Sequence, residues 1–214
     1  MNAAMGPERV KLEGTYVRLV PLDAAEHGQA LWEGTGGPEN ESLWQYMSDG
    51  PFFDRKAFDA HLEKKSASDD PLLYAIVDRA SGRATGLAAL MRIKPKHGVI
   101  EVGNIIFTGA LQKTRGGTET MYLLARYVFD DLGYRRYEWK CNTLNERSQR
   151  AALRLGFSFE GIFRQHMIIK GRNRDTAWFS MLDSEWPARK REFERWLDPS
   201  NFDQEGRQRT ALGR

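Results

Sequence analysis

The segment at residues 111–119, LQKTRGGTE, combines residue types that could hold a phosphate. It joins a predicted strand directly to the start of the strongest predicted helix. Backbone N–H groups at a helix N-terminus lack partners within the helix, and the helix dipole favours an anion there. Gly116 and Gly117 let the backbone approach a ligand, while Lys113 and Arg115 add positive charge. From these residues alone, an anion site and an ordinary exposed loop are equally open.

Two glutamates interrupt apolar strands and are candidates for acid–base chemistry. Glu101 lies in the predicted strand 99–107, and Glu160 lies in the predicted strand 157–169. Burial among apolar side chains raises the pKa of a carboxyl group, which suits a general base near neutral pH. A solvated strand face is the commoner place for a glutamate, and that interpretation stays open for both. Because alternate strand residues share a face, we expect Glu101 to share one with Gly103 and Ile105.

Other catalytic and binding patterns do not occur in the sequence. The histidines form no pair four residues apart, and Cys141 has no nearby partner, so we expect no metal site. The glycines at residues 34–37 do not complete a dinucleotide-binding motif, because Glu39 occupies the third glycine position and Pro38 removes a backbone donor. Residues 188–191 are basic but alternate with an apolar stripe, which favours a solvated helix face over a nucleic-acid site.

Composition narrows the class of protein. The chain has 214 residues, 41% hydrophobic and 29% charged, which is enough for one domain with a sizeable core. Lys and Arg number 32 against 29 Asp and Glu, a balance too even to indicate nucleic acid. The single cysteine excludes an internal disulfide and agrees with a reducing compartment, and no apolar run is long enough to cross a bilayer. We therefore expect a soluble cytoplasmic monomer or homodimer, with no membrane or nucleic-acid partner.

The apolar pattern predicts strands and helices in a fixed order. Strands are expected at residues 15–20, 72–78, 85–92, 99–107, 136–141, 157–169 and 176–182. Helices are expected after the caps Asp23, Asp54 and Asn145, at residues 121–132, and from Glu185. A helical crossover makes the strand at 136–141 parallel to the one at 99–107, while the hairpins are antiparallel.

The fold class is therefore α/β (α+β), with a mixed, mostly antiparallel sheet of about six to seven strands flanked by helices. The expected domain covers residues 15–184. An arm at residues 1–14 precedes it, and a helix followed by a loose tail occupies residues 185–214.

A family resemblance follows from four segments: VIEVGNIIF at 99–107, QKTRGGTE at 112–119, NERS at 145–148 and LRLGFSFEG at 153–161. Together they resemble the GNAT acyltransferases, and most closely the subgroup resembling ribosomal-protein N-terminal (Rim-type) acetyltransferases. The resemblance covers roughly residues 15–185. It implies the GNAT fold, acetyl-CoA as the acetyl donor, and direct attack by a primary amine in a ternary complex without a metal.

The resemblance also assigns residues to CoA. The strand at 105–107 would part from the strand ending at Cys141, and its backbone would bond the pantetheine arm together with Asn145. Arg115 stands where the family's loop carries its first glycine, so it would either bind phosphate, which we favour, or cap the turn. The residues assigned to CoA are Ile105, Ile106, Phe107, Gln112, Lys113, Thr114, Arg115, Gly116, Gly117, Thr118 and Asn145.

The catalytic residues are assigned partly by chemistry and partly by the resemblance. An alkylamine with a pKa near ~10.4 must lose a proton, and the departing thiolate benefits from a proton donor. Many relatives place a donor tyrosine where this chain has Ala152, so the resemblance points to Ser148 instead, although a serine in a first helical turn is commonly structural. Glu160 is expected to be the base more than Glu101, because the resemblance puts it near the acceptor. A water relay is the alternative.

The acceptor is a primary amine, either a small molecule or a peptide N-terminus. The residues expected to line its cleft are Trp44, Asn104, Arg164, His166 and Trp178, although the aromatic residues could equally belong to the core. The resemblance puts His166 on the substrate side of the cleft, and a structural strand histidine is the alternative. Two other functions remain open. One is a non-catalytic acyl-CoA-binding sensor or scaffold module, and the other is a basic interaction protein that uses the C-terminal helix.

Overall fold

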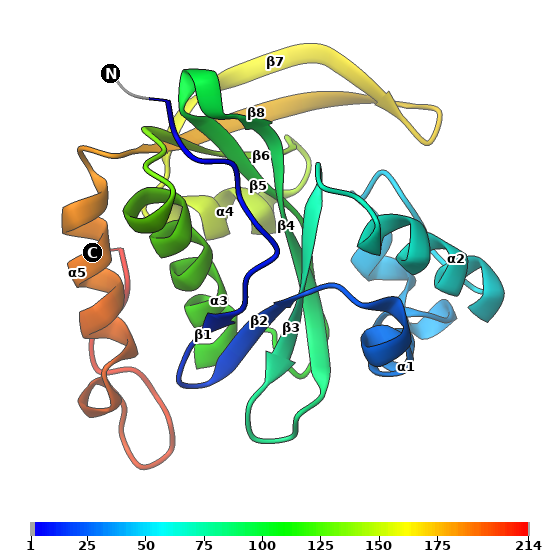
Figure 1. Cartoon of the computed structure of the whole chain (residues 1–214), viewed down its shortest axis with the longest axis horizontal. Coiled ribbons are helices and arrows are strands. Elements are labelled where there is room, and N and C mark those ends of the chain that lie inside the picture. Colours follow the sequence, from blue (N-terminus) through cyan, green and yellow to red (C-terminus); the bar gives the residue numbers. More distant parts are fainter. Residues whose placement is uncertain (1–2, 214) are drawn as a thin grey trace.

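The computed structural model describes residues 3–213, which fold around one eight-stranded sheet (Figure 1). The spatial order of the strands is β1-β2-β3-β4-β5-β6-β8-β7. Among the strands of residues 3–213, only β5 and β6 pair in parallel. The strands are β1 (Leu12–Glu13), β2 (Val17–Pro21), β3 (Leu72–Asp78), β4 (Ala84–Lys94), β5 (Val99–Phe107), β6 (Arg136–Asn142), β7 (Ser158–Ile169) and β8 (Arg172–Leu182). The mixed, mostly antiparallel sheet is confirmed, and the two-residue β1 is the strand that the apolar pattern missed.

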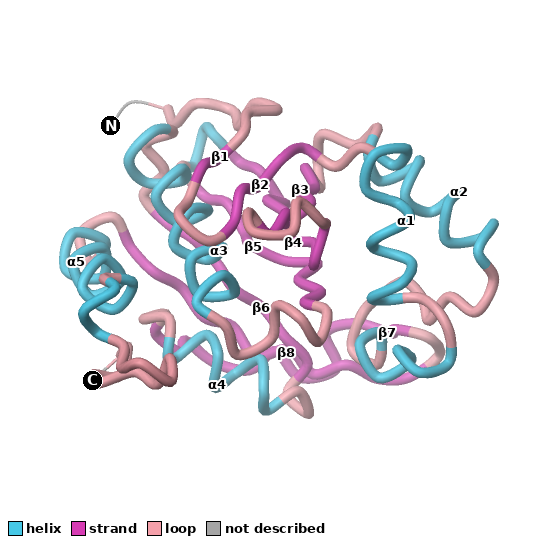
Figure 2. The backbone as a smooth tube through the Cα atoms, turned by 90° about the horizontal axis from the view of Figure 1, so that it is seen from below, coloured by secondary structure: helices cyan, strands magenta, loops and turns pink. Residues whose placement is uncertain are grey.

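Helices cover both faces of the sheet. Helices α1 and α2 lie on the right of Figure 1, while α3, α4 and α5 lie on the left, and Figure 2 shows the strands between the two groups. The longer helices are α1 (Ala24–Thr35), α2 (Arg55–Ser66), α3 (Arg115–Arg126), α4 (Glu146–Arg154) and α5 (Trp186–Leu197). Shorter helical turns are η1 (Pro38–Trp44), η2 (Pro95–His97), the π-helical η3 (Tyr127–Asp131) and η4 (Pro199–Asn201).

The predicted N-caps Asp23, Asp54 and Asn145 are confirmed, since each side chain accepts a hydrogen bond from a backbone N–H in the first turn of its helix. These bonds satisfy donors that a helix cannot pair internally. The start of α4 therefore follows from local chemistry, and this fixes Ser148 in its first turn.

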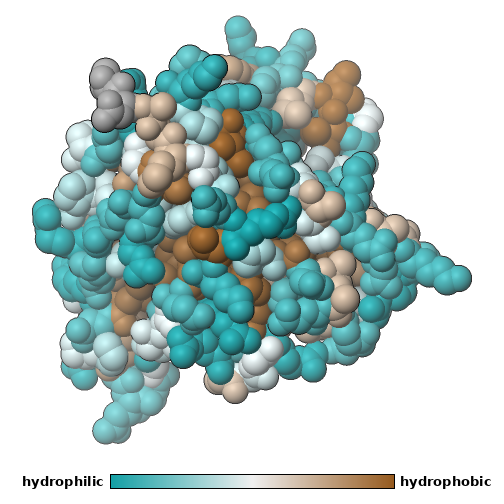
Figure 3. Space-filling view, in the orientation of Figure 1, coloured by the Kyte–Doolittle hydropathy of each residue, from teal (hydrophilic) through white to brown (hydrophobic). Residues whose placement is uncertain are grey.

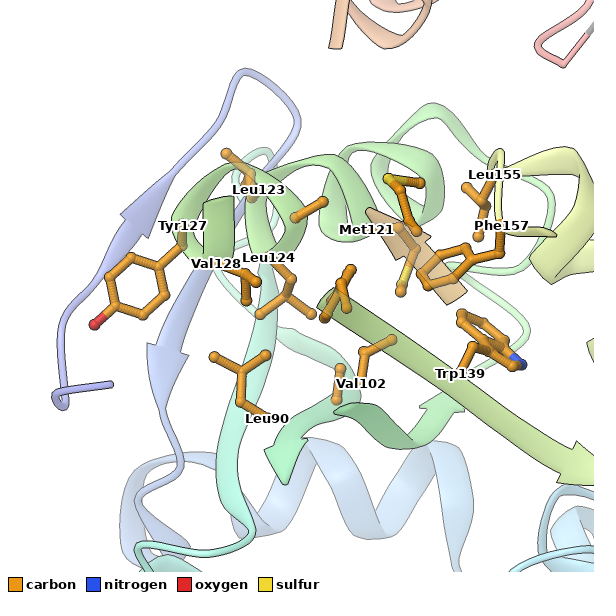
Figure 4. Close-up of a cluster of buried hydrophobic side chains, with 14 of the residues drawn as sticks. Leu90, Val102, Met121, Leu123, Leu124, Tyr127, Val128, Trp139, Leu155 and Phe157 are labelled. Carbon is orange, nitrogen blue, oxygen red and sulfur yellow. The ribbon is translucent and has the colours of Figure 1, made fainter. Parts of the chain in front are cut away.

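Two apolar cores lie on opposite faces of the sheet because side chains alternate along each strand. In β3, Leu72, Tyr74 and Ile76 face the α3 side, and Leu73, Ala75 and Val77 face α1 and α2. Figure 4 shows the larger core beneath α3, where Leu124 and Val128 lie over Leu90 and Val102. Near α4, Met121, Trp139, Leu155 and Phe157 extend the same core. This packing holds α3 and α4 against β5 and β6.

A β-bulge in β5 reverses the alternation of its side chains. The pairing with β4 shifts between Leu87–Ile106 and Ala89–Gly103, and Asn104 adopts a left-handed backbone conformation with φ of 49°. A bulge inserts an extra residue and so changes which face the following side chains take. As a result Ile105 packs on the α3 side, opposite to the face of Glu101. The expectation that Glu101 and Ile105 share a face is therefore wrong.

The parallel strands β5 and β6 part beyond the bulge. Their register runs from Val99–Arg136 to Val102–Trp139 and ends there. The later residues of β5 pair only with β4, while Lys140, Cys141 and Asn142 of β6 pair only with β8. The separation expected for residues 105–107 is therefore present, and it leaves one backbone edge of β5 without a neighbouring strand.

Both terminal segments pack against the domain. The backbone of Ala4 and Met5 bonds the carbonyls of Pro95 and Leu132. The expectation of a loose tail after Asp198 is wrong, because Phe202 and Leu212 are buried. On the face seen in Figure 3, apolar residues form separate patches among hydrophilic ones. Among residues 3–213, no helix has the length and apolar character needed to span a membrane.

Candidate active site

A cavity of about 840 Å³ lies where β5 and β6 part. Its walls come from the end of β5, the first turns of α3 and α4, and the segment at residues 42–47. This volume lies within the range of small-molecule and cofactor sites. Of the residues expected at CoA, those that line the cavity are Ile105, Ile106, Phe107, Gln112, Lys113, Gly117 and Asn145. The parting of two strands therefore brings together side chains that lie up to 40 positions apart, from Ile105 to Asn145.

The loop before α3 is shaped by its own hydrogen bonds. Thr114 caps the helix by accepting the N–H of Gly117 at 3.1 Å, and Gln112 donates to the carbonyl of Phe107 at 2.8 Å. A Cβ on Gly117 would come within 2.9 Å of the Leu111 carbonyl oxygen, so a side chain would displace the loop. At Gly116 a Cβ would instead meet Val17 in the core. Gly117 thus shapes the cavity, whereas Gly116 allows α3 to pack.

Arg115 and Thr118 point away from the cavity, contrary to their expected contact with phosphate. The Arg115 guanidinium lies 3.8 Å from the ring centroid of Phe202 in the C-terminal segment, and it donates to the Tyr16 hydroxyl at 3.4 Å. Such stacking uses the planar cation to hold the segment. The Thr118 hydroxyl accepts hydrogen bonds from Arg154. The side chain of Arg115 therefore anchors the C-terminal segment, which corrects the preference for phosphate binding.

Ser148 lines the cavity and is oriented by two neighbours. Its hydroxyl accepts a hydrogen bond from the Trp139 indole N–H at 3.0 Å, and its backbone N–H donates to the Asn145 side chain at 3.1 Å. Because the oxygen already accepts from Trp139, its proton is directed to another acceptor, which is the Cys141 sulfur in this structure and would be the thioester sulfur of a bound ligand. Burial raises the pKa of the nearby Cys141 thiol, and a hydrogen bond with Ser148 opposes that shift. The arrangement thus presents a serine O–H at the β6 side of the cavity.

Glu101 lies in a buried ionic cluster rather than in the cavity. Its carboxylate accepts from the Lys140 ammonium at 2.7 Å, and Lys140 also donates to Glu138 at 2.6 Å. The ammonium stands 3.9 Å from the ring centroid of Trp178. Burial raises the pKa of Glu101, while Lys140 opposes the shift. With Lys140 bonded to it, Glu101 resembles a structural ion pair more than a free base.

Glu160 forms the outer end of the same cluster. The Arg136 guanidinium donates to it at 2.7 Å, and the Ser180 hydroxyl donates at 2.6 Å. The hydrogen bond from Arg136 lowers the pKa of Glu160 to about 2, although partial burial opposes the shift. A carboxylate with so low a pKa is a weak base. Glu160 also does not line this cavity.

The residues expected at the acceptor are separated from the cavity. Trp44 is only 1% exposed and donates its indole N–H to the Thr35 carbonyl, which makes it a core residue. His166 bonds the Thr176 hydroxyl, and the Trp178 ring packs against Phe163 at a tilted angle on the sheet face opposite α4. None of the five expected residues lines the cavity at β5 and β6; they are Trp44, Asn104, Arg164, His166 and Trp178.

Sequence reasoning missed the segment that covers the cavity. The segment at residues 42–47 follows the glycine-rich stretch and carries the apolar side chains of Leu43 and Met47 beside Tyr46. The Tyr46 hydroxyl donates to the Leu144 carbonyl at 3.0 Å, which ties this segment to the loop before α4. Arg147 and Ala151 of α4 also line the cavity. These two residues are four positions apart, a spacing that puts them on the same helix face and could have indicated that both line one site.

Among the described residues, no three His, Cys, Asp or Glu side chains gather as a metal site.

The fold is that of a known family of acetyltransferases. The model of the GNAT acetyltransferase domain matches residues 17–158. This chain therefore belongs to the GNAT family and is an N-acetyltransferase. Among curated proteins, none matches it.

Solved structures agree with this family. A GCN5-related N-acetyltransferase from Brucella melitensis is 50% identical with a TM-score of 0.97, and the match covers 99% of this chain and 96% of that one. A GNAT-family protein from Chromobacterium violaceum ATCC 12472 is 42% identical with a TM-score of 0.81, over 87% and 93% of the two chains. The ribosomal L7/L12 alpha-N-protein acetyltransferase RimL, in complex with coenzyme A, is 19% identical with a TM-score of 0.68, over 81% and 98%. The last likeness shows the fold alone.

Proposed function

We propose that the protein transfers the acetyl group of acetyl-CoA to a primary amine by direct attack within a ternary complex. The observation that carries this proposal is the 840 Å³ cavity at the parted strands. It exposes the β5 edge, the start of α3 and the Ser148 hydroxyl to one common space. A long thioester and an amine could meet there without a covalent enzyme intermediate.

The chain offers complementary groups for each part of CoA. Backbone N–H and C=O groups at residues 105–107 lack a partner strand on the β6 side, so they suit the amides of the pantetheine arm. The first N–H groups of α3, together with Lys113, suit the pyrophosphate. Asn145 also lines the cavity, where it would bond the arm as well as cap α4.

In the reaction, the amine nitrogen forms a bond to the thioester carbonyl carbon, and the carbon–sulfur bond then breaks. Ser148 would donate its hydroxyl proton to the leaving thiolate, since Trp139 already occupies an acceptor position on its oxygen. The proton of the attacking amine would pass to water in the cavity, because Glu101 and Glu160 are held in ion pairs away from it. Trp139 and Asn145 act here as positioning residues.

The acceptor substrate is an amine, and a peptide N-terminus is one candidate for it. The likeness to RimL, whose name specifies a ribosomal protein, supports only the shared fold at 19% identity. The sequence motifs of the Rim-type subgroup therefore remain the support for a peptide acceptor. Small amines remain equally suitable for the open cavity.

The test is release of free CoA thiol from acetyl-CoA in the presence of peptides, amino acids and polyamines, with mass analysis of the acetylated product. We expect at least one amine class to be turned over. If coenzyme A binds in calorimetry but no amine is acetylated, the chain is a non-catalytic acyl-CoA-binding module. If coenzyme A itself does not bind, the assignment of the cavity is wrong.

A further inference from the structure

A second cavity of about 700 Å³ adjoins the first. It lies between η1, the end of β6 and the turn joining β7 to β8. The two cavities share the wall residues Ser42, Gln45, Tyr46 and Leu144. Two hydrogen bonds define this second space: Tyr46 donates to the Leu144 carbonyl at 3.0 Å, and Lys170 donates to the Trp44 carbonyl at 2.9 Å. The second cavity therefore adjoins the cavity at the parted strands at these four shared residues.

Opposite walls of this second cavity carry opposite charges. Lys170, Arg172 and Arg174 come from the β7–β8 hairpin, while Glu39 and Glu41 come from η1. Among residues 3–213, none of these five side chains forms an ion pair. The cluster of Glu101 and Lys140 shows that this chain pairs charges closely elsewhere. The charges around the second cavity are thus available to a ligand.

Arg174 is the residue of this cavity whose contacts best suit an anion. It is half-buried, and its Nε donates to the Thr176 hydroxyl at 3.2 Å, which leaves its terminal nitrogens free of a bonded carboxylate. Burial lowers the pKa of Arg174, and the charges of Cys141 and Glu101 oppose that shift without bonding the guanidinium, so an anion in the cavity would replace part of the solvation that burial removes. A planar carboxylate matches its donor geometry better than a single oxygen does.

We propose that the second cavity receives the acceptor, and that the acceptor is an amine that also carries a carboxylate close to its amino group. This inference rests on the proposed acetyl transfer. Arg174 and Arg172 hold the carboxylate, while Glu39 and Glu41 attract the ammonium group as it enters. A polyamine is disfavoured as an acceptor, because the hairpin cations repel its positive charges. It also has no carboxylate that could bind these cations. Both a free amino acid and a peptide with an acidic residue near its N-terminus have this chemistry.

The experiment compares matched acceptors that differ only in charge. One arm uses free L-aspartate against L-asparagine amide, and the other uses amidated tripeptides with aspartate or asparagine at the second position. Thiol release gives kcat and KM for each acceptor at saturating acetyl-CoA. In at least one arm, the carboxylate should raise kcat/KM about ten- to a hundredfold, mainly through KM. The arm that responds identifies the source of the carboxylate.

Variants of the full-length chain then assign the effect to the hairpin. Replacing both arginines, Arg172→Gln with Arg174→Gln, should reduce the preference for the carboxylate to less than about threefold while the affinity for coenzyme A is unchanged. Replacing Arg174 with Lys instead of Gln keeps a positive charge and should preserve part of the preference for the carboxylate. The matched control Arg191→Gln changes an exposed arginine on α5 and should leave the preference as in the unaltered chain.

The outcomes separate this inference from the proposed function. If amines are acetylated but the carboxylate gives no advantage in either arm, or a polyamine is the best acceptor, the acceptor class is wrong and acetyl transfer stands. If the double variant keeps the preference, the carboxylate is bound elsewhere. If no amine is acetylated at all, both proposals fail.

Discussion

Two groups of charged residues in this molecule differ in how they are paired. On the sheet face opposite α4, Glu101, Lys140 and Glu138 form a closed cluster that extends through Arg136 to Glu160. Around the second cavity, the hairpin cations and the η1 glutamates have no ionic partners among the described residues. The closed cluster contains the carboxylates that the sequence suggests as bases. Whether a charged residue is ion-paired, rather than its residue type, therefore distinguishes a structural charge from one that can bind a ligand.

Lys140→Met tests the structural side of this comparison and should have the largest effect. The lysine is buried between two carboxylates, with side chains only 4% to 10% exposed. Removing one partner of a buried ion pair leaves uncompensated charge, at a cost of about 3–5 kcal/mol. We expect that loss in the free energy of unfolding by chemical denaturation. The matched control Lys96→Met changes an exposed lysine and should cost under about 0.5 kcal/mol. Equal effects of the two variants would show that the cluster contributes no special stability.

Ser148→Ala tests the cavity side. The hydroxyl lines the cavity and accepts from Trp139, so its proton can reach the leaving thiolate. A proton donor acts mainly in the transition state, so kcat should fall about ten- to a thousandfold with coenzyme A affinity retained. Steady-state kinetics and calorimetry on the same preparation separate the two quantities. Full kcat at a saturating amine would leave Ser148 as a first-turn residue without a catalytic role.

Gly117→Val tests the loop that shapes the cavity. A Cβ there would meet the Leu111 carbonyl oxygen at 2.9 Å and the Phe107 ring at 3.3 Å, so the loop must shift. We expect coenzyme A to bind at least tenfold more weakly, or about 1.4 kcal/mol. Gly109→Val is the control, because a Cβ on Gly109 meets nothing within 4 Å. If titration calorimetry gives the same affinity for both variants, the loop does not bind the pyrophosphate.

Local chemistry explains which parts of the fold were predictable from the sequence. The strands β3 to β8 and the helix starts follow from apolar spacing and from caps such as Asp54 and Asn145, which act within a few residues. The β1 strand spans two residues and the η1 turn has no side-chain cap, so neither carries a comparable signal. Their positions depend on contacts with distant segments, such as the bond from Lys170 to Trp44.

The parts of the site that depend on backbone geometry were predictable from the sequence. The parts that depend on contacts between distant side chains were not. The separation of the strand at residues 105–107 was expected from the family resemblance, and the cap at Asn145 was expected from its residue type and place before a helix. The bulge at Asn104 could not be derived from alternation, because it breaks alternation. The stacking of Arg115 on Phe202 joins residues almost 90 positions apart, which no local pattern indicates. The same limit applies to Trp44, whose type suits a core and a cleft equally.

Glu160→Gln gives the smallest expected change and sharpens the comparison most directly. Its pKa of about 2 lies below the ordinary 4.5, chiefly because Arg136 bonds the ionised form. A depressed carboxyl pKa adds stability above pH 4.5, and this contribution is lost as the pH falls from 4.5 to about 2. The difference in Tm between the unaltered chain and the Gln variant should therefore be positive at neutral pH and shrink across that window. The control Glu63→Gln, an exposed glutamate of α2, should show no such trend.

Glu160→Gln should also have little effect on the reaction. Because the Glu160 carboxylate is already bonded by Arg136 and Ser180, kcat/KM should change less than about twofold and keep the same acid limb in its pH profile. A large loss of kcat with an altered acid limb would instead restore Glu160 as the base and place the outer end of the cluster in the reaction.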